Sequence, residues 1–344
     1  MALGRPGQKD ETFRFGFIAA SDNHSARPGT GYKEFSRKEF TEARFGTFVD
    51  TQLGQRDMRD PAAESEPLEF ETIVTPFANF ETERGASFFL NGGLAAVHAD
   101  GRDRRAIWEA MERREIYGTS GPRILLWFDL LNAPGDQTAP MGSVVALDGA
   151  PRFRVRAIGS FEPRAGCSAE ARAALGRNGI ERLCQGECYR PSDVRRTIRR
   201  IEVVRIRPQL GASEEIAPLI EDPWKVLPCD GDPEGCDLTF TDDEFRSSGR
   251  NALYYVRAIE APSMAVGADP LGCTRNESGA CIDVSPCFGK PWDDDCLSET
   301  EERAWSSPIF VDQAPASLAA STTAASDPPG RNEVFRAGDG GDDA

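Results

Sequence analysis

The chain has 344 residues, of which 39% are hydrophobic, and a formal net charge of -16 at pH 7. This length allows two domains, or one domain with large insertions, and the apolar content is enough for a substantial core. The acidic balance repels phosphate backbones and anionic lipid, which disfavours nucleic-acid and membrane-surface binding, and no apolar segment approaches the ~20 residues that a membrane-spanning helix needs.

The first predicted element is a strand over residues 13–20, FRFGFIAA. Its apolar residues alternate and then run continuously, which is typical of a strand whose second half is buried on both faces. Asp22 and His24 follow its end. Residues i and i+2 of an extended chain point to the same side, so this carboxylate and imidazole can converge on one metal ion. Two ligands alone hold a metal poorly, and the alternative is that Asp22 caps a turn beside an ordinary hydrogen-bonded His24.

The next segments predict an excursion, a second apolar unit and a helix. Residues 27–83 are rich in Gly, Pro, Arg and Glu with weak periodicity, and we expect a long, partly ordered excursion there. Residues 88–98 form an apolar unit that is broken by a turn. Asp103 is a suitable N-cap for a helix over residues 104–116, and Gly118 is a suitable C-terminal stop.

After Gly118 the pattern is typical of strands separated by long loops rich in Gly, Pro and Asp. In residues 153–158 apolar side chains alternate with arginines, which indicates half-exposed sheet, and the spacing of the strands fits an antiparallel sandwich. Residues 313–344 have little to bury and predict a disordered tail. We predict the strands over residues 123–128, 153–158, 201–206, 253–259 and 307–311.

All nine cysteines lie between Cys167 and Cys296, in loop-like sequence. Zinc sites favour CxxC pairs or added histidines, and neither occurs in this stretch, so we expect disulfides that tie down long loops outside the cytoplasm. Because nine is odd, at least one thiol is free or has its partner elsewhere. The N-terminus has no apolar signal-peptide core, and we expect the natural N-terminus of a periplasmic or secreted protein to lie upstream of Met1.

Two further motifs have plain interpretations. Residues 230–235 resemble the start of a calcium loop, but its twelfth position is Thr241 instead of a bidentate Glu. Cys229 and Cys236 could instead close this segment as a disulfide-bounded turn. The basic run over residues 195–200 is most simply a solvated face that leads into the next strand.

Four segments, taken together, resemble the DUF3604 family. They are FGFIAASDNHSARPGTGY at 15–32, GGLAAVHADGRDRRAIWEAMERREIYGTSGPRI at 92–124, LYYVRAIEAP at 253–262 and ERAWSSPIF at 302–310. This family is a large group of bacterial proteins of unassigned function that is related to the PHP (polymerase and histidinol phosphatase) metallohydrolases. The resemblance covers most of the chain up to about residue 311, and it implies that Asp22 and His24 are ligands of a divalent metal, which would be zinc, manganese or iron.

Together with the strand pattern, the resemblance implies an α+β fold. Residues 1–118 would be the C-terminal part of a PHP-like (βα) barrel, residues 119–312 an antiparallel β-sandwich-like domain with disulfide-rich loops, and residues 313–344 the tail. The family site also needs an early histidine-rich motif, whereas His24 and His98 are the only histidines here. We therefore expect an incomplete C-terminal portion of a family member, inactive alone, in which His98 is an ordinary histidine near a strand end.

The implied function is a metal-dependent hydrolase that acts on a phosphoester, a sulfate ester or another ester. Its metal would lower the pKa of a bound water. Arg123 could present a fork to a small or polymeric anionic substrate, or it could form a structural salt bridge between the two domains. The alternative function is a noncatalytic extracytoplasmic binding or structural module. A fragment of a barrel would expose apolar strand edges, which predicts poor solubility or association.

Overall fold

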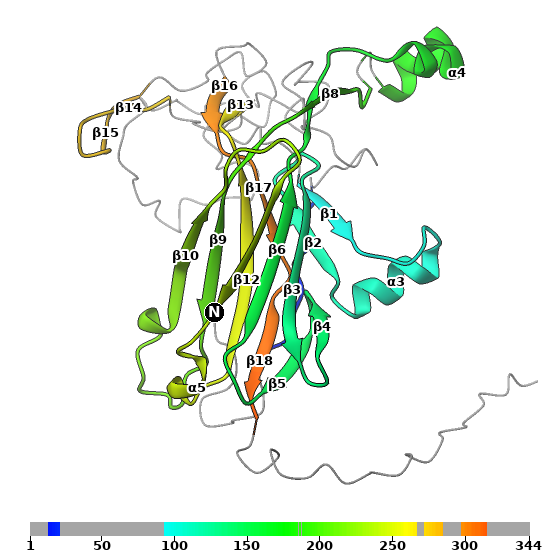
Figure 1. The fold of residues 1–344 in the computed structure, drawn as a ribbon. Coiled ribbons are helices and arrows are strands. Elements are labelled where there is room, and N and C mark those ends of the chain that lie inside the picture. Colours follow the sequence, from blue (N-terminus) through cyan, green and yellow to red (C-terminus); the bar gives the residue numbers. More distant parts are fainter. Residues whose placement is uncertain are drawn as a thin grey trace, which may run out of the picture.

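The structure is a computed structural model that describes residues 13–20, 93–184, 186, 188–266, 272–284 and 297–314. This part is mostly antiparallel β-sheet with few helices, and no sheet in it closes into a barrel. Its long strands run side by side in Figure 1. The expected antiparallel sheets are therefore confirmed, whereas a PHP-like barrel is not seen in the described residues.

The larger sheet has eight strands in the order β1-β2-β17-β12-β18-β5, with β9 beside β12 and β10 beside β9. Only the pair of β18 and β5 is parallel among these described strands. The central strand β12 is buried over nearly its whole length, as expected for a strand covered on both faces. The strands are β1 (Leu94–Val97), β2 (Ile116–Thr119), β5 (Val144–Leu147), β9 (Ile198–Ile206), β10 (Ile220–Pro228), β12 (Ala252–Glu260), β17 (Arg303–Ser306) and β18 (Ile309–Gln313).

The second sheet has the order β11-β6-β3-β4. In β6 the arginines are exposed and the residues between them are buried, which confirms the alternation predicted for residues 153–158. Each strand predicted after residue 118 is present, with its bounds shifted by a few residues. The strands of this sheet are β3 (Leu125–Ala133), β4 (Gln137–Pro140), β6 (Arg152–Ile158) and β11 (Cys236–Thr241).

One hydrophobic core joins the two sheets. Phe153 of β6 stacks on Phe128 and Phe240 within its own sheet, with ring centroids 5.4 and 5.1 Å apart. It also packs on Tyr254 of β12, across the core, at 4.7 Å. Buried aromatic rings contribute large apolar areas, so these contacts hold the sheets face to face as in a sandwich.

Three short two-stranded sheets complete the described strands. They are β7 (Phe161–Pro163) with β8 (Pro191–Arg195), β13 (Ser263–Val266) with β16 (Leu297–Thr300), and β14 (Thr274–Arg275) with β15 (Cys281–Asp283). The helical segments are α3 (Arg104–Glu112), α4 (Ala169–Gly179), the π-helical turn η4 (Ile180–Cys184), the 3-10 turn η5 (Ala217–Leu219) and α5 (Phe245–Ser248).

The predicted helix start is confirmed, and its predicted end is wrong. Asp103 Oδ1 accepts hydrogen bonds from the first-turn amides of Arg105 and Ala106, at 2.9 and 3.0 Å. The helix ends at Glu112, and Ile116 and Gly118 belong to β2, which lies between β1 and β17. This distant pairing overrides the helical pattern, and the sequence around the helix gives no sign of it.

The segment of residues 13–20 is not a regular strand, so the expectation of a buried strand is wrong. Phe13 and Ile18 are 63% and 59% exposed. The segment lies against the larger sheet through Phe17, whose ring packs on Tyr255 at 5.1 Å and whose amide donates to Ser307 Oγ at 3.0 Å. Side-chain packing therefore holds this segment in place without strand pairing.

The proposed boundary between domains falls inside β2, at residues 118 and 119, and β2 is hydrogen-bonded to β17. The division into domains stays a prediction. The expected excursion over residues 27–83, the apolar residues before Gly93 and the tail after residue 314 lie outside the described residues.

Candidate functional site

The sequence singled out Asp22, His24 and Arg123. Asp22 and His24 lie outside the described residues. The last described residue before them is Ala20, whose backbone lies beside Gly93, since a Cβ on Gly93 would be 3.1 Å from Ala20 O. Ala19 is equally close to Gly118, near the end of β2. The described segment thus ends beside the end of β2 from which the Arg123 loop departs.

Arg123 lines a pocket of about 340 Å³, counted with its open mouth. Three arginines contribute to the lining, namely Arg123, Arg190 and Arg196. Phe161, Tyr189 and three prolines supply apolar walls. This volume includes open solvent, so the site is a surface hollow, and its arginines make it suited to a small anion.

The loop after β2 is fixed by its contacts with the start of β17. Ser120 N donates to Arg303 O at 2.9 Å, and Ser120 Oγ accepts from Arg303 N at 2.9 Å and donates to Glu302. Gly121 follows with a φ of 134°, a conformation that favours glycine. These contacts explain why a turn containing serine and glycine precedes Arg123, and they hold the base of that side chain.

The Arg123 guanidinium stacks over the Tyr189 ring at 3.7 Å from its centroid. Arg123 is exposed and makes no ion pair with a described residue. Cation–π stacking restricts the guanidinium plane but leaves its N–H groups able to donate. The side chain is therefore oriented and can accept an anionic partner.

Ser160 is the buried residue of the pocket lining, and behind it lies a buried glutamate, Glu260. Ser160 lines the pocket and is 2% exposed, and its Oγ has no hydrogen-bond partner among the described residues. Its amide donates to Glu260 Oε1 at 2.5 Å, whereas Glu260 Oε2 is equally without a described partner. Burial raises the pKa of Glu260, opposed chiefly by the hydrogen bond from the Ser160 amide and also by the charge of Arg196. Unsatisfied buried polar atoms are rare in proteins, and a hydrogen bond between the Ser160 hydroxyl and the Glu260 carboxyl would satisfy both without a ligand.

His98 is held as an ordinary histidine, as expected. Its Nε2 lies 2.8 Å from Leu126 O, a carbonyl that can only accept, so this nitrogen carries a proton. The ring packs between Tyr117 and Trp127, at 5.4 and 5.8 Å between centroids. Nε2 of His98 is therefore engaged in this hydrogen bond.

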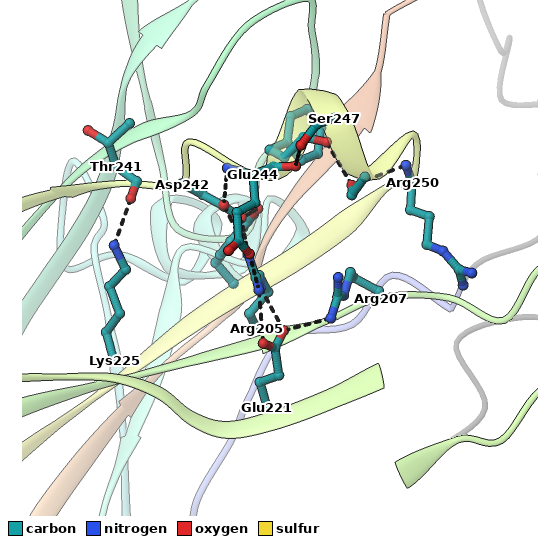
Figure 2. Close-up of polar contacts among 12 residues, drawn as sticks. Arg205, Arg207, Glu221, Lys225, Thr241, Asp242, Glu244, Ser247 and Arg250 are labelled. Carbon is teal, nitrogen blue, oxygen red and sulfur yellow. Dashed lines mark hydrogen bonds and ion pairs between the residues drawn. The ribbon is translucent and has the colours of Figure 1, made fainter. Parts of the chain in front are cut away.

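A second charged cluster lies inside the sandwich and is shown in Figure 2. Arg205 of β9 is ion-paired with Glu221 at 2.6 Å, with Asp242 at 2.9 Å and with Glu244 at 2.9 Å. Tyr254 donates to Asp242 Oδ2 at 2.6 Å, and burial together with the charge of Asp242 raises the pKa of Tyr254 above its usual range. The side chains of Arg205 and Asp242 are 4% and 1% exposed, so a ligand does not reach them and the cluster is structural.

The basic run over residues 195–200 is not a solvated face, so that interpretation is wrong. Arg195 lies over the Phe161 ring at 3.8 Å and donates to Gly159 O at 2.7 Å. Arg200 is ion-paired with Glu301 at 2.6 Å. These partners are distant in the sequence, so the basic run alone does not reveal them.

The described part of the chain contains three disulfides: Cys167–Cys188, Cys229–Cys236 and Cys273–Cys281. The second closes the segment that resembles a calcium loop, which confirms the interpretation as a disulfide-bounded turn. Cys184 is a free thiol in the described part, and Cys287 and Cys296 lie outside it. This use of cysteine is typical of an oxidising compartment.

Sequence reasoning missed Ser160, Tyr189 and Glu260. Tyr189 and Ser160 lie in loop-like sequence without a motif. Glu260 had a visible signal, because it is an acidic residue directly after the apolar run of β12.

Residues 8–159 match the DUF3604 family. The family is described as a protein of unknown function, and the match includes Asp22, His24 and Arg123 but ends before Ser160. No curated protein and no solved structure matches this chain. Within the described residues, no helix is both long and apolar enough to cross a membrane.

Proposed function

We propose that this chain is a DUF3604 protein that acts outside the cytoplasm as a metal-dependent hydrolase of the PHP type, with Arg123 binding the anionic group of an ester substrate. The observation that supports it best is the oriented Arg123 guanidinium, without an ion-pair partner among the described residues, over a pocket. The segment that precedes Asp22 and His24 in the sequence ends, at Ala20, beside the same end of β2. The three disulfides favour the extracytoplasmic location.

The donor chemistry of Asp22 and His24 fits zinc, manganese or iron, which accept carboxylate oxygen and imidazole nitrogen. Two ligands are fewer than the three protein ligands of a typical catalytic zinc site, and His98 Nε2 is bonded to Leu126 O. Further ligands would have to come from other residues, so we derive no reaction step through the metal. A bound metal of this kind would supply Lewis acidity and a water of lowered pKa.

The residues of the pocket would bind and orient the substrate. Arg123 can donate two parallel N–H bonds to a phosphate, sulfate or carboxylate group. The apolar walls of Phe161 and the prolines would exclude water from the rest of a small ester.

Metal analysis tests the metal part of this proposal. The metal content of the purified protein is compared with that of Asp22→Ala and His24→Ala. His98→Gln is the matched control, because a glutamine amide can still donate to Leu126 O. We expect both ligand variants to lose bound metal and the control to keep it. Unchanged metal content in Asp22→Ala and His24→Ala would exclude these residues as ligands.

A second function is favoured by the position of the pocket. All of its described lining residues lie between Pro122 and Arg196, so the described part of the pocket forms without Asp22 or His24. A noncatalytic module that binds anionic ligands would use this pocket alone. Binding of an anionic ester that persists in Asp22→Ala, in a protein that holds no metal, would favour this second function.

A further inference from the structure

Three cysteine sulfurs meet at one place away from the Arg123 pocket. The Sγ atoms of Cys167, Cys184 and Cys188 all lie within 4.8 Å of one another. Cys167 and Cys188 form a buried disulfide, whereas Cys184 is a half-exposed free thiol at the last residue of η4. They lie beside α4, which stands apart from the two main sheets in Figure 1.

The local structure keeps the thiol beside the disulfide. Cys184 and Ala171 of α4 pack against the small cluster that Ile180 forms with the two bonded cysteines. Cys188 N donates to Gly166 O at 3.4 Å, next to Cys167. The three cysteines therefore pack in one small apolar cluster, which keeps their sulfur atoms close together.

We propose that Cys184 is the attacking thiol of a thiol–disulfide exchange site in which three cysteines share one disulfide. The Cys184 thiol gives its proton to solvent, and the thiolate attacks Cys188 Sγ. The Cys184–Cys188 bond forms and the Cys167–Cys188 bond breaks, and Cys167 leaves as a thiolate that takes up a proton. Attack on Cys167 Sγ releases Cys188 in the same way. The number of disulfides is conserved, so the step needs no oxidant or reductant.

A metal site is the competing use of three cysteines. A metal binds thiolates, and two of these sulfurs are bonded to each other, so the cluster offers only the Cys184 thiol while the disulfide is intact. The disulfide Cys229–Cys236 provides a comparison, because no third cysteine of the described residues lies within the same distance. Among the described disulfides, only Cys167–Cys188 has a third described cysteine within this distance.

The exchange acts on one wall of the Arg123 pocket. Cys188 directly precedes Tyr189, the ring on which Arg123 stacks. The disulfide to Cys167 ties the residue before that ring to the start of the α4 segment. If Cys184 attacks Cys167, Cys188 is released and this covalent link is lost. If Cys184 attacks Cys188, the residue before Tyr189 is linked to Cys184 in place of Cys167.

Disulfide mapping tests the proposal. The protein is purified without reductant, incubated at mildly alkaline pH with N-ethylmaleimide, and digested in acid with pepsin, which prevents further exchange because thiolates are absent. Mass spectrometry then identifies labelled and bonded cysteines. We expect the label at Cys184 and also at Cys167 or Cys188, together with the complementary disulfides.

Cys184→Ser is expected to abolish labelling of Cys167 and Cys188 and to leave only their mutual disulfide. Leu183→Ser, at the exposed preceding residue, is the matched control and should keep the wild-type distribution. Three results would overturn the proposal: wild-type protein labelled at Cys184 alone, a stable disulfide from Cys184 to Cys287 or Cys296, or zinc bound by the three reduced cysteines.

Discussion

The buried cluster of Arg205 allows a quantitative prediction for Asp242→Ala. The substitution removes both acceptor oxygens that Arg205 Nη1 contacts at 2.9 Å, and it removes the acceptor of the Tyr254 hydroxyl. Breaking a buried ion pair costs about 3–5 kcal/mol because a charge stays buried without its partner. Arg205 keeps Glu221 and the largely exposed Glu244, so we expect the lower end, about 3 kcal/mol.

Tyr254→Phe separates the hydrogen bond from the ion pair. It removes the hydroxyl but leaves Asp242 paired with Arg205, so we expect a loss of about 1.5 kcal/mol, the lower end for a hydrogen bond to a charged group. The double variant should lose less than the sum of the two single losses, because both substitutions remove the same hydrogen bond.

Urea unfolding followed by tryptophan fluorescence measures these changes, with the disulfides kept intact. Asp243→Ala is the matched control, since Asp243 is exposed beside Asp242 and its substitution should change stability by about 0.5 kcal/mol or less. A loss below about 1 kcal/mol for Asp242→Ala would refute the reasoning that this cluster depends on a buried charge pair.

Two further predictions concern Glu260 and Asp103. Burial raises the pKa of Glu260, so its contribution to stability is complete below its usual pKa of about 4.3 and is lost as the pH rises through the raised value. In urea titrations, the free energy of unfolding of Glu260→Gln should therefore rise relative to that of the wild type as the pH increases from about 4 to 7. A difference between the two proteins that does not change with pH would contradict the ionisation of a buried Glu260. Asp103→Ala should lower the free energy of unfolding by about 1 kcal/mol through loss of the N-cap of α3, whereas Asp103→Ser should restore most of it; equal losses in both variants would argue against capping.

The features that the sequence predicted correctly depend on local patterns. The alternation over residues 153–158 reflects the two faces of one strand, and the cap at Asp103 reflects the first turn of one helix. Both rules operate within a few residues, so no knowledge of distant segments is needed.

The features that it missed depend on distant partners. Ile116 continues the helical pattern, but pairing of β2 with β1 and β17 places it in a strand. The apolar segment of residues 13–20 has no strand partner and lies on the sheet through its aromatic side chains. Tyr189 stacks on Arg123 from a different loop, so the pocket is visible only in three dimensions.

The most direct test of the proposed function is binding of an anionic ester at Arg123, measured by calorimetry with p-nitrophenyl phosphate and p-nitrophenyl sulfate, and with inorganic phosphate and sulfate. Arg152→Gln, at the opposite end of β6 from the pocket, is the control for the loss of one positive charge. A charged hydrogen bond contributes about 1.5–3 kcal/mol, so we expect Arg123→Gln to weaken binding by about tenfold or more while Arg152→Gln leaves it unchanged. Equal affinities of the wild type and Arg123→Gln, or no binding to the wild type, would contradict the assignment of this pocket.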